Sequence, residues 1–210
     1  MPEGERGGTA LVLLHGFGAR ADDLLPFAQH LMRPRSRFFV PAGPLSQGSE
    51  GRAWWYFDER ERSLREWDGQ VPLAHQPHEQ VLRVREALQT LLASVREHYA
   101  PERLALAGFS QGGMLTLDVA LASEPSVDRA AVLSGALITE SMEALRRERT
   151  SRPSFFLSHG RADRIVPFRA AEGTHSLLTG AGFPVAFEAF EGGHEIPPQV
   201  LAKVANFVYG

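Results

Sequence analysis

The stretch Gly108-Phe109-Ser110-Gln111-Gly112-Gly113 lies between two contrasting patterns. The apolar run Arg103–Ala107 before it is typical of a buried strand, and residues 114–123 after it have a helical pattern. A strand, then G-x-S-x-G, then a helix is the context of a nucleophile elbow, a sharp turn that exposes a serine at its apex. The glycines leave room for the turn, and the first N–H groups of the helix face any negative charge beside the serine. The pattern predicts a nucleophilic Ser110; the alternative is a tight turn without chemistry.

Outward from this motif, apolar runs that suit strands alternate with patterns that suit helices. Strands that are apolar on both sides and separated by helices indicate a mostly parallel sheet covered on both faces. The carboxyl ends of such strands share one edge, where ligands and catalytic groups gather. We therefore expect one α/β domain over residues 1–210. The expected strands are 9–14, 37–40, 103–107, 130–133, 154–157 and 185–190, and the expected helices are 21–32, 78–98, 111–123, 140–149, 168–180 and 198–208.

Residues 43–77 depart from this alternation, and we expect an irregular insertion rich in Gly, Pro, Arg and aromatic residues. It holds all three tryptophans and two aromatic neighbours: Trp54, Trp55, Trp67, Tyr56 and Phe57. Long irregular segments in compact domains are commonly functional. Two interpretations stay open: the rings anchor the segment to the body of the protein, or they form a flap or pocket wall over the serine. In the second case Trp54, Trp55 and Tyr56, with Ile165 from a later loop, are candidate substrate contacts.

A serine hydroxyl becomes a good nucleophile only beside a base, which in turn needs an orienting acid. Around a nucleophile elbow the chain order is serine, acid, histidine. Asp163 follows the strand 154–157, and His194 lies in the glycine-containing turn after the strand 185–190. We expect these two to serve as acid and base, although Asp163 also suits a turn or helix cap. Glu195 is the rival acid, but its position next to His194 makes an orienting contact awkward.

An oxyanion hole needs two N–H donors aimed at the reacting carbonyl. The N–H of Gln111 supplies one, because it opens the helix after the serine. The second is expected in the turn His15–Gly18, where two glycines flank Phe17 and let its N–H point toward the pocket. His15 precedes the turn at the strand end, so we interpret it as structural rather than as a second base.

Composition excludes several classes of function. The chain of 210 residues has no cysteine, hence no thiol nucleophile, disulfide or thiolate metal site. A formal net charge of -3 gives no electrostatic case for binding nucleic acid or an anionic membrane. The first residues do not read as a signal peptide, and no apolar stretch reaches the roughly 18 residues of a membrane span, so a cytoplasmic location is expected. No metal ion is expected, because Pro77 keeps His75 and His78 off a regular helix face shared with Glu79.

Five motifs, in this order, resemble the phospholipase/carboxylesterase family of α/β-hydrolases, which includes small bacterial carboxylesterases, acyl-protein thioesterases and lysophospholipases. They are His15-Gly-Phe-Gly18, Gly108-Phe-Ser-Gln-Gly-Gly113, Leu133-Ser-Gly135, His159-Gly-x-x-Asp163-x-x-Val-Pro167 and Gly193-His-Glu-Ile196. The resemblance implies a compact sheet without a large cap domain, a triad of Ser110, His194 and Asp163, and an oxyanion hole from Phe17 and Gln111. The chain departs from the family pattern at Trp54-Trp55-Tyr56-Phe57-Asp58, which has an extra aromatic residue.

The expected function is hydrolysis of small or medium-chain acyl esters or thioesters, with no cofactor. Lysophospholipase or acyl-protein thioesterase activity is the alternative within the enzyme class. A non-catalytic scaffold that binds a small apolar ligand or a protein is the alternative outside it. The expected partner is a small-molecule ester or thioester, without nucleic acid or stable membrane insertion, and a homodimer is left open.

Overall fold

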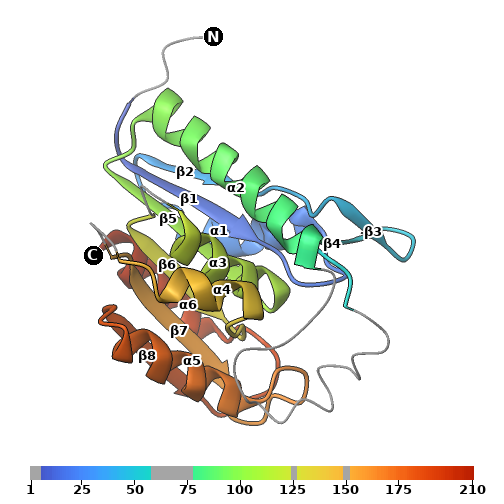
Figure 1. Cartoon of the computed structure of the whole chain (residues 1–210). Coiled ribbons are helices and arrows are strands. Elements are labelled where there is room, and N and C mark those ends of the chain that lie inside the picture. The colour runs from blue at the N-terminus through green and yellow to red at the C-terminus, as the bar shows by residue number, and fades with distance from the viewer. Residues whose placement is uncertain (1–5, 58–77, 124–126, 149–151) are drawn as a thin grey trace.

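The computed structural model describes residues 6–57, 78–123, 127–148 and 152–210. Six strands form the central sheet in the order β2-β1-β5-β6-β7-β8, and every neighbouring pair in it is parallel (Figure 1). This confirms the mostly parallel α/β sheet that the sequence predicts. The strands are β1 (Thr9–Leu14), β2 (Ser36–Phe39), β5 (Arg103–Phe109), β6 (Arg129–Leu133), β7 (Ser154–Gly160) and β8 (Val185–Phe190).

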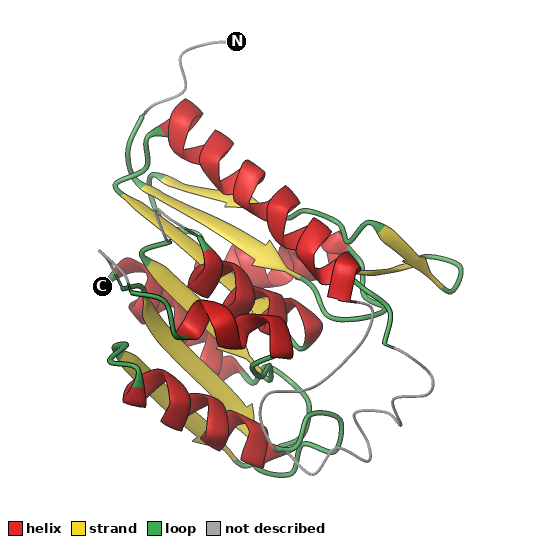
Figure 2. Ribbon diagram, viewed as in Figure 1, coloured by secondary structure: helices red, strands yellow, loops and turns green. Residues whose placement is uncertain are grey.

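Helices cover both faces of this sheet, as Figure 2 shows. On one face lie α2 (His78–Tyr99), α3 (Gln111–Ala122), α4 (Thr139–Leu145) and α5 (Phe168–Gly180); on the other lie α1 (Leu25–Leu31) and α6 (Pro198–Tyr209). Side chains of a strand alternate between the faces. Val12 therefore packs in the core under α2 and α3, whereas Leu11 and Leu13 pack in the core under α1 and α6. No helix among these described residues is long and apolar enough to cross a membrane.

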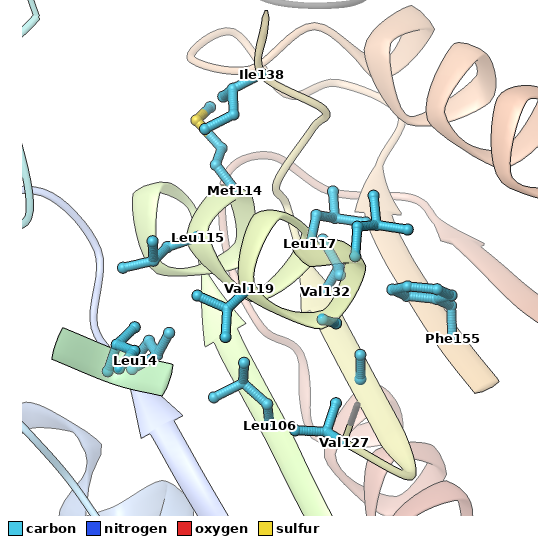
Figure 3. Packing of buried hydrophobic residues seen from close by; sticks show 14 of the residues in the cluster. Leu14, Leu106, Met114, Leu115, Leu117, Val119, Val127, Val132, Ile138 and Phe155 are labelled. Atoms are coloured by element: carbon cyan, nitrogen blue, oxygen red, sulfur yellow. The ribbon is translucent and has the colours of Figure 1, made fainter. Parts of the chain in front are cut away.

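The helix α3 is buried on every side, which suits its apolar sequence. Figure 3 shows Leu115 and Val119 of this helix packed near Leu14 and Leu106 of the strands beneath. The one charged residue of the helix is Asp118, which is fully buried. Because Ser110 directly precedes α3, this packing fixes the position of the predicted nucleophile.

Several element boundaries differ from those expected. The expected helix 21–32 is divided into a 3₁₀ turn, η1 (Ala21–Leu24), and α1, which has a proline in its first turn. The expected helix 140–149 ends at Leu145. Residues 146–148 are charged and exposed, so they add no apolar side chain to the buried face of the helix. The strand expected at 154–157 continues to Gly160.

The first part of the segment 43–77 was wrongly expected to be irregular. It contains an antiparallel hairpin formed by β3 (Leu45–Gln47) and β4 (Gly51–Ala53). Strands of three residues are too short to show a periodic pattern, which explains why the sequence did not reveal them. Residues 58–77, including Trp67 and His75, lie outside the described residues.

The order of strands reverses beside the elbow. From β1 the chain first builds β2 on one side and then crosses to β5 on the other side. At such a reversal of strand order, the loops that leave the carboxyl ends diverge and open a ligand site. Leu14 of β1 is the register partner of Gly108 of β5, so the turns at His15–Gly18 and Ser110 leave the sheet side by side.

Candidate active site

Ser110 adopts a strained backbone conformation at the end of β5. Its φ of 54° and ψ of -118° lie outside the regions that side chains favour. The surrounding backbone holds it there: the Ser110 N–H donates to Leu133 O (2.8 Å), and its carbonyl accepts the Met114 N–H (3.0 Å). Strain of this kind persists only where packing imposes it, and it is concentrated at functional sites.

The two glycines of the G-x-S-x-G motif are required by close backbone contacts. A Cβ on Gly108 would lie 2.1 Å from Gly112 O, and a Cβ on Gly112 would lie 2.2 Å from Leu14 O. Neither backbone atom can move without displacing β1 or α3. The sharp elbow and the tight contact between strand and helix therefore depend on both glycines, as the sequence predicts.

The turn after β1 lies directly against the elbow. A Cβ on Gly16 would lie 3.4 Å from the Cβ of Ser110. Within this turn the Gly18 N–H donates to Arg52 O (2.9 Å) and the Ala19 N–H donates to Gly16 O (3.2 Å). The Phe17 N–H has no protein acceptor among the residues that the structure describes. The turn thus presents a donor near Ser110, as an oxyanion hole needs.

The Gln111 side chain, buried at the start of α3, ties the elbow to the segment after the hairpin. Its Oε1 accepts the Trp54 N–H (3.0 Å), and its Nε2 donates to Trp55 O (2.8 Å). The sequence predicts a role only for the backbone N–H of this residue and gives no sign of these side-chain hydrogen bonds. These two hydrogen bonds fix Trp54 and Trp55 relative to Ser110.

Asp163 and His194 are brought together by the structure. The Nδ1 of His194 lies 2.7 Å from Oδ2 of Asp163, and the other carboxylate oxygen accepts the N–H groups of Ile165 (2.8 Å) and Val166 (2.9 Å). Burial alone would raise the pKa of Asp163, but hydrogen bonds from His159 and His194 outweigh it and hold the pKa well below its usual value. The ionised form of Asp163 is therefore favoured, and it accepts the Nδ1–H of His194, which leaves Nε2 as the ring nitrogen that could accept a proton.

The loops that carry these two residues are joined by backbone contacts. The Arg161 N–H donates to Phe190 O (2.9 Å) and the Ala162 N–H donates to Gly192 O (2.9 Å). The ring centroids of His194 and Phe109, the residue before Ser110, also lie 4.7 Å apart. Elbow, acid and histidine therefore share one edge of the sheet. The rival acid Glu195 instead accepts the Gly193 N–H (3.2 Å).

The family of this chain follows from a match to the model of a known protein family. The family model for phospholipase/carboxylesterase matches residues 2–210. The chain belongs to this family. A probable carboxylesterase of Oryza sativa subsp. japonica is 28% identical over 217 residues, which are 97% of this chain and 77% of that protein. Acyl-protein thioesterase 1 of Gibberella zeae is 32% identical over 112 residues, about half of each chain (51% and 48%).

A solved structure shows the same fold. The crystal structure of SOBER1 from Arabidopsis thaliana has a TM-score of 0.80 at 26% identity, and the match covers 96% of this chain and 98% of that one. The phospholipase/carboxylesterase family and the α/β-hydrolase fold that the sequence motifs resemble are thereby confirmed.

The candidate substrate contacts have two different environments. Trp54 and Trp55 are 2% and 0% exposed, and the Trp54 indole stacks on His15, with ring centroids 4.9 Å apart. This burial supports the anchoring interpretation for both tryptophans. Tyr56 and Ile165 are 38% and 37% exposed, and the Tyr56 hydroxyl donates to Ser46 O.

An apolar cavity of about 460 Å³ lies beside Trp54. It is lined by Pro41, Ala42, Pro44, Leu45 and Trp54 and by one face of α2. None of the residues expected to be catalytic lines it. No group of three or more His, Asp or Glu side chains among the described residues could hold a metal ion.

Proposed function

We propose that this phospholipase/carboxylesterase family member is a serine hydrolase that cleaves small or medium-chain acyl esters or thioesters through an acyl-enzyme on Ser110. The observation that carries the proposal is the 2.7 Å contact between His194 and Asp163, on loops that meet the strained elbow of Ser110. Serine, acid and histidine follow in the order that this elbow requires. We further propose that residues 1–210 act as one domain.

In the acylation step, the Ser110 Oγ attacks the carbonyl carbon of the substrate. Nε2 of His194 accepts the hydroxyl proton, and Asp163 stabilises the imidazolium through the Nδ1–H. The N–H groups of Phe17 and Gln111 donate to the oxyanion. Each such donor contributes about 3 kcal/mol to the stability of the transition state.

The tetrahedral intermediate then collapses, and His194 gives its proton to the departing alkoxide or thiolate. A water molecule next attacks the acyl-enzyme, with His194 as general base, and releases the carboxylic acid and free Ser110. Protons balance over the cycle, so the residues present are sufficient for the chemistry.

We place the acyl group beside Tyr56 and Ile165, because these exposed side chains follow Trp55, whose carbonyl binds Gln111, and Asp163, whose carboxylate binds the Ile165 N–H. Direct contact of Trp54 or Trp55 with substrate stays a prediction, as do the cytoplasmic location and the homodimer. A relative named acyl-protein thioesterase favours thioesters as the second substrate class to test. The binding-scaffold alternative is not favoured, since no expected catalytic residue is missing.

The test is hydrolysis of p-nitrophenyl esters from acetate to palmitate, with Ser110→Ala prepared and assayed in parallel. We expect turnover by the wild type that Ser110→Ala lowers by at least about 10³-fold. The chain length with the highest kcat/KM then measures the acyl pocket. A folded wild type that hydrolyses no ester or thioester, or equal rates in both proteins, would contradict the proposal and favour the binding scaffold.

A further inference from the structure

A second histidine contacts the carboxylate that orients His194. We propose that His159 is a positioning residue, which holds the Asp163 carboxylate in the orientation that His194 needs and shares the charge of the oxygen that His194 contacts. This inference rests on the proposed function, in which Asp163 orients the catalytic base. His159 takes no part in the proposed proton transfers and does not touch the reacting atoms.

His159 is the second-to-last residue of β7, and its side chain is fully buried. Its Nε2 is 2.8 Å from Val166 O and 3.2 Å from Oδ2 of Asp163. A carbonyl and an ionised carboxylate are both acceptors, so Nε2 must carry a hydrogen. His159 thus donates between the two, and one of its two acceptors is the same oxygen that His194 contacts at 2.7 Å.

The opposite ring nitrogen of His159 makes no hydrogen bond within the described part of the chain. Nδ1 is buried and has no hydrogen-bond partner among the described residues. The His159 ring packs against Phe168, with ring centroids 6.1 Å apart. His159 therefore donates through Nε2 alone and from a fixed position, whereas the His194 side chain is 17% exposed.

With His159 in place, every acceptor site of Asp163 faces a donor. Two backbone N–H groups bind Oδ1, His194 binds Oδ2, and Nε2 of His159 lies 3.2 Å from that same oxygen. The carboxylate cannot rotate away from His194 without breaking hydrogen bonds. Because His159 takes part of the charge on Oδ2, less of that charge is available to stabilise the imidazolium form of His194.

Other charged groups near the pair have partners of their own. The Glu195 carboxylate accepts the Gly193 N–H, and Arg161 lies over the Phe168 ring at 4.9 Å and pairs with Glu191 at 3.3 Å. Loss of the His159 donor should therefore act on His194 mainly through Asp163. We expect the acid limb of the pH–rate profile to move to higher pH when that donor is removed.

The experiment compares wild type with His159→Phe, which keeps a ring but removes the donor, and His159→Gln, which places a side-chain N–H near the position of Nε2. Rates for a p-nitrophenyl ester are measured from pH 5 to 9 and normalised to active sites titrated with a fluorophosphonate. For His159→Phe we expect kcat to fall at least about 10-fold and the acid limb of kcat/KM to move up by about half a pH unit. His159→Gln should restore most of both.

An NMR titration of the His194 ring gives a readout that needs no turnover. The midpoint should rise in His159→Phe and return toward the wild-type value in His159→Gln. An active wild type with an unchanged acid limb and an unchanged midpoint in His159→Phe would overturn the positioning role. An inactive wild type would overturn the proposed function, while the NMR midpoint still tests His159. If His159→Phe does not fold, His159→Met serves as the variant without a donor.

Discussion

His15, at the end of β1, has a buried side chain whose two ring nitrogens are both engaged. Nδ1–H donates to Gly16 O (2.8 Å), and Nε2 accepts the Gly43 N–H (2.9 Å). An Nε2 that accepts a hydrogen bond has no proton, so the ring is neutral. Burial penalises the charged form and lowers the pKa of His15. The ring thus anchors the residues before the hairpin, in agreement with the structural role that the sequence indicates.

This environment predicts a pH dependence of stability. An unfolded histidine has a pKa of about 6.5, so below that pH the unfolded state binds a proton that the native state resists. The contribution of His15 to the free energy of unfolding is complete above about pH 6.5, and it declines as the pH falls toward the lower native pKa. We expect His15→Gln to reduce the loss of unfolding free energy between pH 7 and pH 5 by about 1 kcal/mol, measured by urea unfolding. An identical loss in both proteins would show that His15 does not titrate in this range.

Gly112 gives a second prediction at the scale of one residue. Gly112→Ala places a methyl group against Leu14 O, which is backbone and cannot yield. We expect the free energy of unfolding to fall by about 2 kcal/mol or more and ester hydrolysis to be lost with the displaced elbow. Gly180→Ala is the matched control, because a Cβ there meets no atom within 4 Å and alanine favours a helix. Equal effects of the two substitutions on thermal unfolding and activity would contradict this account.

At the scale of elements, a buried ion pair joins three helices around the predicted nucleophile. Arg85 of α2 makes two hydrogen bonds to Asp118 of α3, from Nε (2.7 Å) and Nη2 (2.6 Å). Ser141 of α4 donates to the same carboxylate (3.0 Å), and Arg85 also donates to Glu140 O (3.2 Å). Because α3 starts at the elbow, this contact fixes the position of Ser110 relative to α2 and α4.

Removing one partner of a buried ion pair leaves the other charge without compensation. We expect Arg85→Met to lower the free energy of unfolding by about 3 kcal/mol or more. The double substitution of Arg85→Met with Asp118→Leu should recover most of that loss, because it removes both charges. Urea unfolding of both single variants and the double variant measures the coupling. Additive losses would show that the pair does not act as a unit.

The regular elements could be predicted from the sequence because each has a local pattern. The stripe along α2 and the apolar runs of the central strands are visible within a few residues of one another. The hairpin of β3 and β4 is too short for such a pattern. The extension of β7 to Gly160 was also missed, because Ser158 and His159 interrupt the apolar run although both are buried.

At the scale of the whole molecule, topology explains why the site residues could be located. Parallel strands end at one edge, so the residues after β1, β5, β7 and β8 approach one another whatever the intervening sequence. Contacts between distant side chains have no such rule. The bonds of Gln111 to Trp54 and Trp55, and the pair of Arg85 and Asp118, depend on how helices and loops pack, which no local pattern records.

Activation of Ser110 as a nucleophile by His194 can be measured by covalent labelling. The protein is treated with a fluorophosphonate, and the modified peptide is identified by mass spectrometry. We expect one adduct per chain, on Ser110, none in Ser110→Ala, and a labelling rate at least about 100-fold lower in His194→Ala. An adduct on another serine, or a folded wild type that takes up no label, would contradict it.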